Sequence, residues 1–512
     1  METNEFKNGW PVLSAAAIGV GLGMSPLPFY TIGVFIPPLL AEFGPMGWNA
    51  GDIINALAIY TLGAFAMAPV IGILTDRFGA RRVALVSIVT FGLSLMALAL
   101  NNGSKGMYVF LWLLMAAAGS GTLPITFTRP VANWFDKNRG IALGIALIAT
   151  GVFGALAKYF TQYVITLTDW RTAYVALGLL PIVIVLPIAF LTLRDLDDEP
   201  ARDASISGLK VPILGISLIG LLGFIWLTLS EVTPLVRANG LQLEYAVAYV
   251  FSALVLIPVG LLLIFNIRTD PPVKAVNQDG SAIQLPGMEL GEALRDWRFW
   301  LLAISFVPIS YAVGAIIPNL ERVLTAGSFD MSRAVGLATL TGLAVLAGRT
   351  IGGYLIDRFW APGIAFIFLA SPAIALWMLG QPDPTVLSVQ IAILMIGFGA
   401  GVEYDFMAFM VSRYFGMRNY SAIYGSIYGF FALGAGLGPG IMTNLAEGRG
   451  LTIVFWRTGL LEGKDWTFTL TTAAIILFVS TLPLLFLGKY RFGHGIDPVA
   501  DGVADGEVVT AE

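Results

Sequence analysis

The chain has 512 residues, of which 57% are hydrophobic and only 12% are charged. A soluble domain carries about 25% charged residues, so this composition excludes a protein that covers its whole surface with polar side chains. Because there is no cysteine and only one histidine, His494, disulfides, thiol catalysis and a His/Cys metal centre are excluded. We expect no metal ion, no other cofactor and no nucleic-acid partner; the net charge of −4 indicates little, because charge matters here by side of the membrane.

The apolar residues fall in runs that are long enough to cross a bilayer as helices, which needs about 20 residues for 30 Å of hydrocarbon. The short alternating segments of a transmembrane β-barrel do not occur. The first run leads directly into further runs and has no small-residue cleavage site, so it predicts a retained helix rather than a signal peptide. The fold class is therefore all-α and polytopic, in a lipid bilayer.

Six spans are predicted first, near residues 12–40, 52–74, 83–101, 107–133, 140–167 and 172–193. Two more, near 211–233 and 244–266, stand between a polar linker that starts at 194 and a hydrophilic segment at 267–296, whose end resembles a short amphipathic helix. Six further spans follow near 297–319, 333–356, 361–380, 386–411, 420–445 and 466–488. The predicted domains are a six-helix bundle (1–193), a linker with two inserted helices (194–296), a second six-helix bundle (297–490) and a disordered acidic tail (491–512), with about fourteen spans in all.

A charged motif repeats half a chain apart, which indicates duplication. "GILTDRFGARR" at 72–82 shares Gly-x-Leu-x-Asp-Arg-Phe with "GYLIDRF" at 353–359, 281 positions later. "WFDKNRGIALG" and "YFGMRNYSAIYG" repeat in the same way, with Phe135 and Phe415 separated by 280 positions. An even number of spans puts both termini on one side, and most Lys and Arg residues outside the spans fall on that side. The positive-inside rule then predicts that both termini and both motifs are cytoplasmic, in a cell inner membrane.

The repeated motif has two interpretations. The simpler one is a topology anchor made of arginines. The second is a gate, in which a carboxylate at a helix boundary binds the N-terminus of a neighbouring helix and an Arg, and releases both when the halves rock. We favour the gate because an anchor needs arginine but does not need Asp-Arg-Phe in both halves. The predicted gating residues are Asp76, Arg77 and Arg81 in the first copy and Asp357 and Arg358 in the second.

These residues resemble the loop signature of the major facilitator superfamily, Gly-x-Leu-x-Asp-Arg-x-Gly-Arg-[Lys/Arg]-[Lys/Arg], with Ala80 at the first basic position. The resemblance extends from about residue 9 to residue 490, without the inserted pair. It implies two six-helix bundles around a central cavity that opens to the two sides of the membrane in turn.

A narrower resemblance is to monocarboxylate and oxalate:formate-type transporters within that superfamily. It rests on the stretches "NGWPVL", "YTIGVFIPPLLAEF", "VANWFDKNRGIALGIA", "EALRDWRFWLLAISF" and "SRYFGMRNYSAIYGSIYG". The group has a substrate-facing arginine in the helix that holds Arg349, and its animal members often have an aspartate one turn earlier, where this chain has Val345. The inserted helices depart from the usual twelve, so no particular substrate is implied.

Ionisable side chains inside spans cost roughly 2.5–3.5 kcal/mol on insertion scales and usually face a cavity. Arg349 is predicted to bind a substrate carboxylate, with Lys158 and Arg129 as further cations; for each, the alternative is a side chain that snorkels to the membrane surface. Tyr30 lies in a proline-rich first span and is a possible hydrogen-bond donor to substrate. Glu403 and Asp405 are predicted proton carriers, and at about 100° per residue they point to nearly opposite faces of one helix.

We therefore predict a secondary transporter for a small organic carboxylate, coupled to protons as a symporter or working as an anion exchanger. The alternative is a proton-coupled efflux transporter for hydrophobic drugs, since fourteen spans occur in such families. A receptor or an intramembrane enzyme is disfavoured because the sequence has no Ser/His pair, metal-ligand spacing or GxxxxGK[ST] loop.

Overall fold

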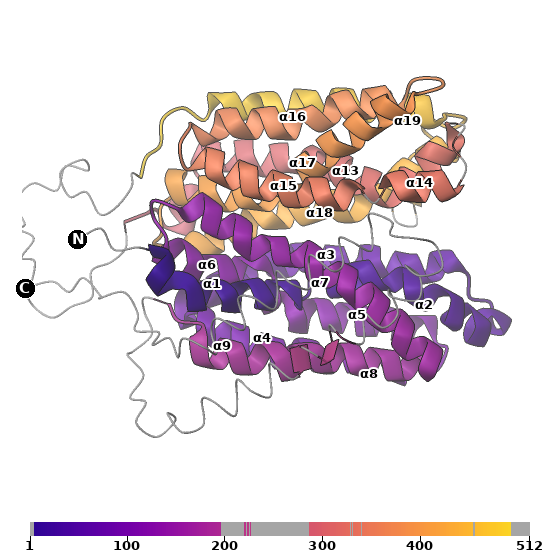
Figure 1. Ribbon diagram of the computed structural model, residues 1–512, viewed down its shortest axis with the longest axis horizontal. Helices are drawn as coiled ribbons and strands as arrows, with labels where there is room; N and C mark the ends of the chain where they lie inside the picture. Colours follow the sequence, from indigo (N-terminus) through magenta and orange to yellow (C-terminus); the bar gives the residue numbers. More distant parts are fainter. Residues whose placement is uncertain are drawn as a thin grey trace, which may run out of the picture.

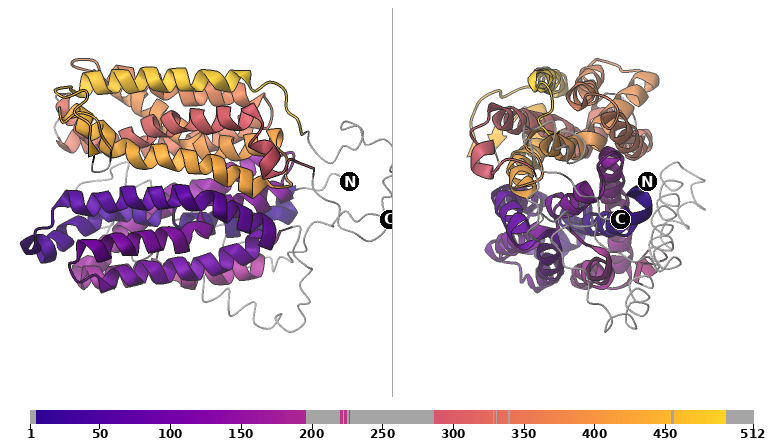
Figure 2. Two further views of the ribbon diagram at one scale, coloured as in Figure 1. Left: turned by 180° about the vertical axis from the view of Figure 1, so that it is seen from behind. Right: turned by 90° about the vertical axis from the view of Figure 1, so that its left-hand side faces the viewer.

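The computed structural model describes residues 5–195, 220–221, 223–224, 226, 286–327, 329, 331–338, 340–453 and 456–492. Helices dominate the described residues, and they form two bundles that lie side by side (Figure 1). The first bundle, indigo to magenta, comes from the N-terminal half, and the second, orange to yellow, from the C-terminal half. The end-on view in Figure 2 shows the two bundles as separate groups of roughly parallel helices. This is the predicted two-bundle architecture.

The N-terminal bundle contains α1 (Glu5–Gly21), α2 (Leu27–Phe43), α3 (Ala50–Phe78), α4 (Ala80–Ala97), α5 (Lys105–Gly119), α6 (Pro124–Trp134), α7 (Arg139–Leu167), α8 (Trp170–Leu180) and α9 (Leu186–Thr192). Three of its six spans are interrupted. The span predicted at 12–40 as one helix breaks between Gly21 and Leu27, where Pro26 has no backbone N–H to donate and Gly23 has a low helix propensity. A 3₁₀ turn at Ser120–Thr122 separates α5 from α6, and a short π-helix at Pro181–Val185 separates α8 from α9.

The C-terminal bundle contains α13 (Trp297–Ala326), α14 (Met331–Ala338), α15 (Leu340–Ile356), α16 (Ala361–Leu379), α17 (Val386–Tyr414), α18 (Tyr420–Ala446) and α19 (Trp466–Thr481). The short helix expected before the first of these is α12 (Leu290–Ala293). A small antiparallel hairpin, β1 (Thr452–Ile453) with β2 (Trp456–Arg457), follows α18. The rest of the bundle is helical because long apolar segments satisfy their backbone groups internally only as helices or closed barrels.

Eleven helices of the described residues are long and apolar enough to cross a membrane, and two shorter apolar helices, Gly9–Gly21 and Leu340–Ile356, accompany them. Together they account for the twelve spans predicted for the two halves. The inserted pair and the tail fall mostly on residues outside the described ranges. A few residues of the predicted span 211–233 are described, and one of them, Phe224, packs on Phe153 and Phe160 of α7 with ring centroids 6.3 and 5.1 Å apart.

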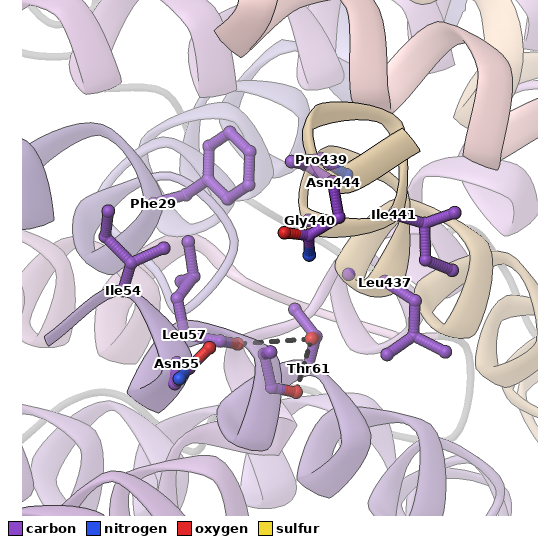
Figure 3. A pocket seen from close by; sticks show the side chains of 12 residues that line it. Phe29, Ile54, Asn55, Leu57, Thr61, Leu437, Pro439, Gly440, Ile441 and Asn444 are labelled. Carbon is purple, nitrogen blue, oxygen red and sulfur yellow. Dashed lines mark hydrogen bonds between the residues drawn. The ribbon is translucent and has the colours of Figure 1, made fainter. Parts of the chain in front are cut away.

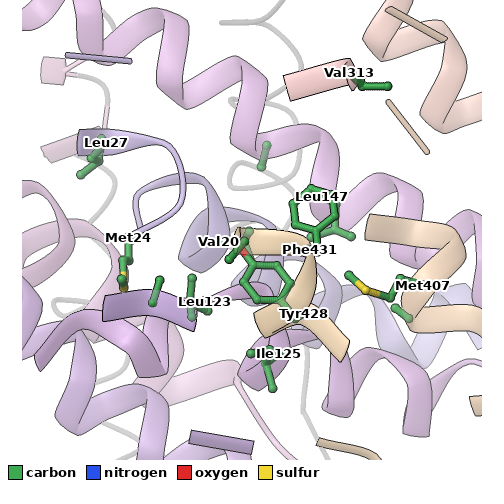
Figure 4. Packing of buried hydrophobic residues seen from close by; sticks show 14 of the residues in the cluster. Val20, Met24, Leu27, Leu123, Ile125, Leu147, Val313, Met407, Tyr428 and Phe431 are labelled. Atoms are coloured by element: carbon green, nitrogen blue, oxygen red, sulfur yellow. The ribbon is translucent and has the colours of Figure 1, made fainter. Parts of the chain in front are cut away.

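The two bundles share one continuous apolar core. Figure 4 shows Tyr428 and Phe431 of α18 in one cluster with Val20, Leu123 and Ile125 of the N-terminal bundle. The closest approaches between bundles run along α3 with α18 and along α7 with α15. Polar residues lie along both of these seams, and they make up the site.

Candidate functional site: an interdomain gate and a central cavity

The carboxylate of Asp76, at the end of α3, crosses from one bundle to the other. It accepts hydrogen bonds from the backbone N–H groups of Ser421 (3.1 Å) and Ala422 (2.7 Å) at the N-terminus of α18. Arg129 of α6 donates to the same carboxylate at 2.6 Å. A negative charge at a helix N-terminus interacts favourably with the unpaired N–H groups and the helix dipole. Asp76 therefore fastens the first half of the chain to the second.

Asp357 makes the reciprocal contact from the C-terminal bundle. Its carboxylate accepts hydrogen bonds from the N–H groups of Gly140 (2.7 Å) and Ile141 (3.0 Å) at the N-terminus of α7. The separation of 281 positions that relates Asp76 to Asp357 also relates Gly140 and Ile141 to Ser421 and Ala422. The duplicated motif has thus produced two equivalent interdomain contacts, which we call the latch: Asp76 with Ser421–Ala422 and Asp357 with Gly140–Ile141.

The contacts described for the other predicted gating residues lie within their own bundles. Arg77 and Arg358 are exposed, and each guanidinium lies against a neighbouring ring, Phe78 at 5.4 Å and Tyr354 at 3.6 Å from the centroid. Arg81 donates to the carbonyl oxygen of Phe190, within its own bundle. The acidic residues of the motif therefore make the latch, and these three arginines face outward or brace their own half.

Arg129 lies in the latch rather than in the central cavity. Its side chain is buried and forms ion pairs with Asp76 at 2.6 Å and with Asp195 at 3.0 Å. Asp195 follows α9, and Asn133 also donates to it at 2.6 Å. This placement corrects the sequence analysis, which grouped Arg129 with substrate-binding cations: two carboxylates already satisfy its charge.

Charged residues that the sequence analysis did not select strengthen the latch side. Arg139 donates to Ser412 of the other bundle at 3.1 Å, and Arg413 lies 3.6 Å from Asp136. Glu5 accepts backbone N–H bonds in the loop before α7 at 3.0 to 3.1 Å. Burial raises the pKa of the Glu5 carboxyl, but these hydrogen bonds outweigh burial and lower the pKa overall, so Glu5 is ionised at neutral pH. The repeated "WFDKNRG" stretch was the available signal for Asp136 and Arg139.

Glycines of the motif let the backbones meet under the latch. A Cβ on Gly72 of α3 would lie 2.2 Å from the carbonyl oxygen of Ser421, and a Cβ on Gly353 would lie 2.6 Å from that of Gly140. Each obstacle is backbone in the opposite bundle, so it cannot rotate away. Glycine is required at both positions for this closed arrangement.

Gly72→Ala is expected to open the latch. Overpacking costs about 1–3 kcal/mol, or roughly 5- to 100-fold in the equilibrium between closed and open states. The reporter is a cysteine at Thr128, which is fully buried beneath the latch in this Cys-free chain. Maleimide should modify Thr128→Cys at least about fivefold faster when Gly72→Ala is present. Gly33→Ala is the matched control, because no atom lies within 4 Å of a Cβ there; equal rates in both backgrounds would contradict a glycine-dependent closure.

A cavity of about 230 Å³ lies between the bundles, on the side of the latch toward the middle of the helices. Its lining comes from both halves of the chain. The residues of the N-terminal bundle are Met24, Ser25, Pro26, Phe29, Tyr30, Tyr60, Thr61, Ala64, Leu123, Thr150 and Gly151. Those of the C-terminal bundle are Val313, Gly314, Ile317, Pro318, Val345, Arg349, Ala400, Glu403, Tyr404, Tyr428, Phe431, Ala432 and Ala435. We call this space the central cavity.

Arg349 is buried in the wall of the central cavity, with 3% of its surface exposed. Its Nε donates to the carbonyl oxygen of Gly401 at 2.8 Å, and Nη1 donates to the Thr150 hydroxyl of the other bundle at 3.0 Å. The guanidinium carbon lies 6.0 Å from the centre of the Tyr404 ring. Within the described part of the chain, no protein acceptor is found for Nη2. The arginine is thus oriented by the protein and keeps donor capacity toward the cavity.

Glu403 and Asp405 separate as their helical spacing predicts. Glu403 lines the central cavity, and its Oε1 is buried without a hydrogen-bond partner in the described structure. Asp405 is fully buried outside the cavity lining, and neither of its oxygens has a hydrogen-bond partner among the described residues. Its Oδ2 lies 3.5 Å from where a Cβ on Gly144 of α7 would stand, so Asp405 occupies the contact between α17 and the other bundle. Only Glu403 can meet a ligand in the cavity directly.

The remaining predicted substrate residues divide in the same way. Tyr30 lines the central cavity, and its ring packs where a Cβ on Gly154 would lie, 2.4 Å from the nearest ring atom. Lys158 is exposed on α7, four residues after Gly154 and so further from the latch. It is not among the residues that line the cavity. Of all the described lining residues, Arg349 and Glu403 alone carry charge.

A smaller hollow of about 90 Å³ continues away from the latch between α2, α3 and α18. Figure 3 shows Phe29, Ile54 and Leu57 on one side of it and Leu437 and Ile441 on the other. Phe29 and Thr61 line both spaces, so the two are adjacent. Asn55 and Asn444 line this hollow and are not among the residues that line the central cavity.

A family model described as Major Facilitator Superfamily matches residues 18–251 and 235–439. The chain belongs to the Major Facilitator Superfamily. Together with the apolar helices, this membership identifies a multi-pass membrane protein, and it favours a transporter over an enzyme. The superfamily resemblance of the repeated motif is therefore confirmed.

A probable triacylglyceride transporter of Mycobacterium bovis is 28% identical over 214 residues, which is 41% of this chain and 41% of the relative. The chain thus matches about two fifths of the length of that relative. An uncharacterized transporter of the same superfamily from Escherichia coli is 20% identical over 386 residues, 74% of this chain and 75% of the relative.

Two solved structures share the fold. The human organic anion transporter MFSD10 superposes with a TM-score of 0.59 at 16% identity, covering 94% of this chain and 100% of that chain. A proton:xylose symporter, XylE, superposes with a TM-score of 0.57 at 13% identity, covering 95% and 97%. At these identities the likeness supports the two-bundle fold and not a substrate.

Proposed function

We propose that this protein is a secondary transporter that moves a small organic carboxylate across the cytoplasmic membrane by alternating access, coupled to protons. The observation that carries the proposal is the buried, oriented guanidinium of Arg349 in the wall of the central cavity. A planar fork of N–H donors matches a carboxylate with two parallel hydrogen bonds. The narrower resemblance to monocarboxylate and oxalate:formate-type transporters agrees with this substrate class.

The support for an anion comes from Arg349 alone. Three membrane cations favoured an anionic substrate in the sequence, but Arg129 is neutralised in the latch and Lys158 is not a lining residue. A single charge in a low-dielectric cavity attracts an anion far more strongly than it would in water. One arginine is therefore sufficient for binding, and it fixes where the carboxylate lies.

Glu403 supplies the proton in this scheme. When Glu403 is ionised, its charge offsets that of Arg349 across the same cavity, and a substrate anion is repelled. Protonation removes that charge and leaves Arg349 to the substrate carboxylate. Anion and proton then bind together, which is symport; Asp405, buried at the interdomain contact, is the other acidic candidate.

Glu403→Gln and Asp405→Asn are expected to separate the two carboxylates. The variant of the true proton carrier should keep exchange of labelled acid across the membrane and lose accumulation driven by a pH gradient by about tenfold or more. The other variant should retain coupled accumulation. The measurement is uptake and counterflow in proteoliposomes; if both variants accumulate acid as the wild type does, neither residue carries the proton and anion exchange replaces symport.

The latch closes one side of the central cavity, and we place that side in the cytoplasm. The structure then represents the state that faces outward, with the smaller hollow on the path to the exterior. A cysteine at Arg82, which is exposed on the latch side, should resist an impermeant label in intact cells, and a cysteine at Asn102, exposed at the opposite ends of the helices, should react. Labelling of Arg82→Cys and protection of Asn102→Cys would reverse the orientation.

Export of hydrophobic compounds is the second candidate, because the central cavity is mostly apolar and aromatic. The partial similarity to triacylglyceride transporters points the same way. Against it, a site for hydrophobic cations needs acids in the N-terminal half of the cavity, and the described lining residues of that half carry no charge. Transport of hydrophobic cations without transport of carboxylates would establish this second candidate.

A further inference from the structure

We propose that the substrate carries one carboxylate on an aromatic body about the size of a benzene ring, bound with the carboxylate toward α15 and α17 and the ring toward α2 and α3. This inference rests on the proposed function and names its substrate class. It follows from three independent properties of the central cavity: where its charges lie, which rings surround it, and how large it is.

The charges of the central cavity lie in one half only. The position in the first half that corresponds to Arg349, 281 residues earlier, is Ala68, and the one that corresponds to Glu403 is Thr122. The duplication has therefore left an ionic end at α15 and α17 and an uncharged end at α2 and α3. A ligand with two carboxylates would place its second charge where no described lining residue is a cation, and burying an unpaired charge is costly. A single carboxylate fits this polarity.

Six aromatic side chains line the central cavity. Phe29, Tyr30 and Tyr60 come from the N-terminal bundle, and Tyr404, Tyr428 and Phe431 come from the C-terminal one.

Two of the hydroxyl groups are already occupied, since Tyr60 donates to the Met24 carbonyl and Tyr428 lies 3.3 Å from the Ser25 hydroxyl. Tyr404 packs on Tyr428 and Phe431 with centroid distances of 5.8 and 4.7 Å. These tyrosines offer ring faces and edges, which favour a flat apolar ligand.

The volume sets the size of that ligand. An apolar protein cavity of about 150 Å³ holds benzene. The central cavity of about 230 Å³ has room for such a ring together with a carboxylate and a short link between them. Acetate or formate would leave the aromatic surface uncovered, and a triacylglycerol is far too large for the space between the bundles in this state.

Tyr30 gives the sharpest test, because its ring and its hydroxyl can be removed separately. Binding to the purified full-length protein is measured by titration calorimetry with phenylacetate, acetate and malonate. Phenylacetate should bind at least about tenfold more tightly than either aliphatic acid. Tyr30→Ala should weaken phenylacetate binding about 3- to 10-fold and leave acetate unchanged, because an aromatic pair contributes beyond its area. Tyr30→Phe should change phenylacetate binding less than twofold.

Gly154→Ala should reproduce the effect of Tyr30→Ala by displacing the ring, and Gly33→Ala on the helix of Tyr30 is the silent control. Phe431→Leu, from the other bundle, should show the same selective loss if Tyr30→Ala does not fold. Tight Arg349-dependent binding of acetate or malonate, equal to that of phenylacetate, would overturn this inference and leave the carboxylate transporter intact. Binding of tetraphenylphosphonium with no binding of any acid would overturn both.

Discussion

Replacing Arg349 with alanine is expected to lower kcat/KM for carboxylate uptake by at least about 30-fold, and replacing it with lysine by at least about 10-fold. Truncating one partner of a buried, hydrogen-bonded charge pair costs about 2–5 kcal/mol, and each 1.4 kcal/mol is tenfold. Lysine keeps the charge but has no planar fork and cannot bond to Gly401 and a carboxylate in the same geometry. Charge alone is therefore insufficient at this position.

Arg358→Ala is the matched control, because it removes the same charge just beyond the end of the same helix from an exposed position stacked on Tyr354. Its kcat/KM should stay within about twofold of the wild type, as expected of a surface arginine. Initial uptake rates in proteoliposomes, corrected for the amount of protein inserted, provide the comparison. If Arg349→Lys and Arg358→Ala have equal kcat/KM, Arg349 does not bind the substrate carboxylate through two hydrogen bonds.

Asp76→Asn is expected to lower the turnover number at least about tenfold while KM changes less than about threefold. The carboxylate accepts two N–H bonds from the start of α18 and an ion pair from Arg129, and hydrogen bonds to charged groups contribute about 1.5–3 kcal/mol each. Loss of this charge destabilises the closed latch without touching the central cavity. Because the latch controls the rate at which the two bundles change between conformations, the turnover number falls more than the substrate affinity.

Asp357→Asn should have the same effect because it makes the equivalent contact, and the double variant should be slower than either single one. Both should also accelerate modification of Thr128→Cys beneath the latch. Arg77→Ala, in the same motif but exposed, should leave turnover and cysteine reactivity near wild type. An Asp76→Asn protein with normal turnover and poor substrate binding would contradict the latch.

The duplicated architecture was predictable because it depends on composition and on a repeat that any reader can align. The carboxylates of the latch were predictable for the same reason, since Asp76 and Asp357 recur in register. Their partners were not predictable, because they are backbone N–H groups, which every residue except proline has. These groups belong to Ser421, Ala422, Gly140 and Ile141. The first span was recognisably proline-rich, but the break between α1 and α2 was not predicted; both helices pack on α7 on either side of it.

Buried charges were harder to assign from sequence, because depth in a span does not tell what a side chain meets. Arg129 and Arg349 both lie in apolar segments, yet Asp195, which neutralises Arg129, comes from the end of a distant span. Helical periodicity did separate Glu403 from Asp405, since that property is local to one helix. Thr150, which orients Arg349 from the other bundle, gave no signal at all.

The most direct test of the carboxylate proposal is uptake into proteoliposomes, with and without an inward proton gradient, after subtraction of protein-free vesicles. The panel comprises labelled mono- and dicarboxylates and one hydrophobic cation. We predict that a carboxylate accumulates, that the gradient increases its accumulation, and that Arg349→Ala abolishes the uptake. Uptake of the hydrophobic cation alone, or equal carboxylate uptake by Arg349→Ala and the wild type, would contradict the carboxylate site and leave export of hydrophobic compounds in its place.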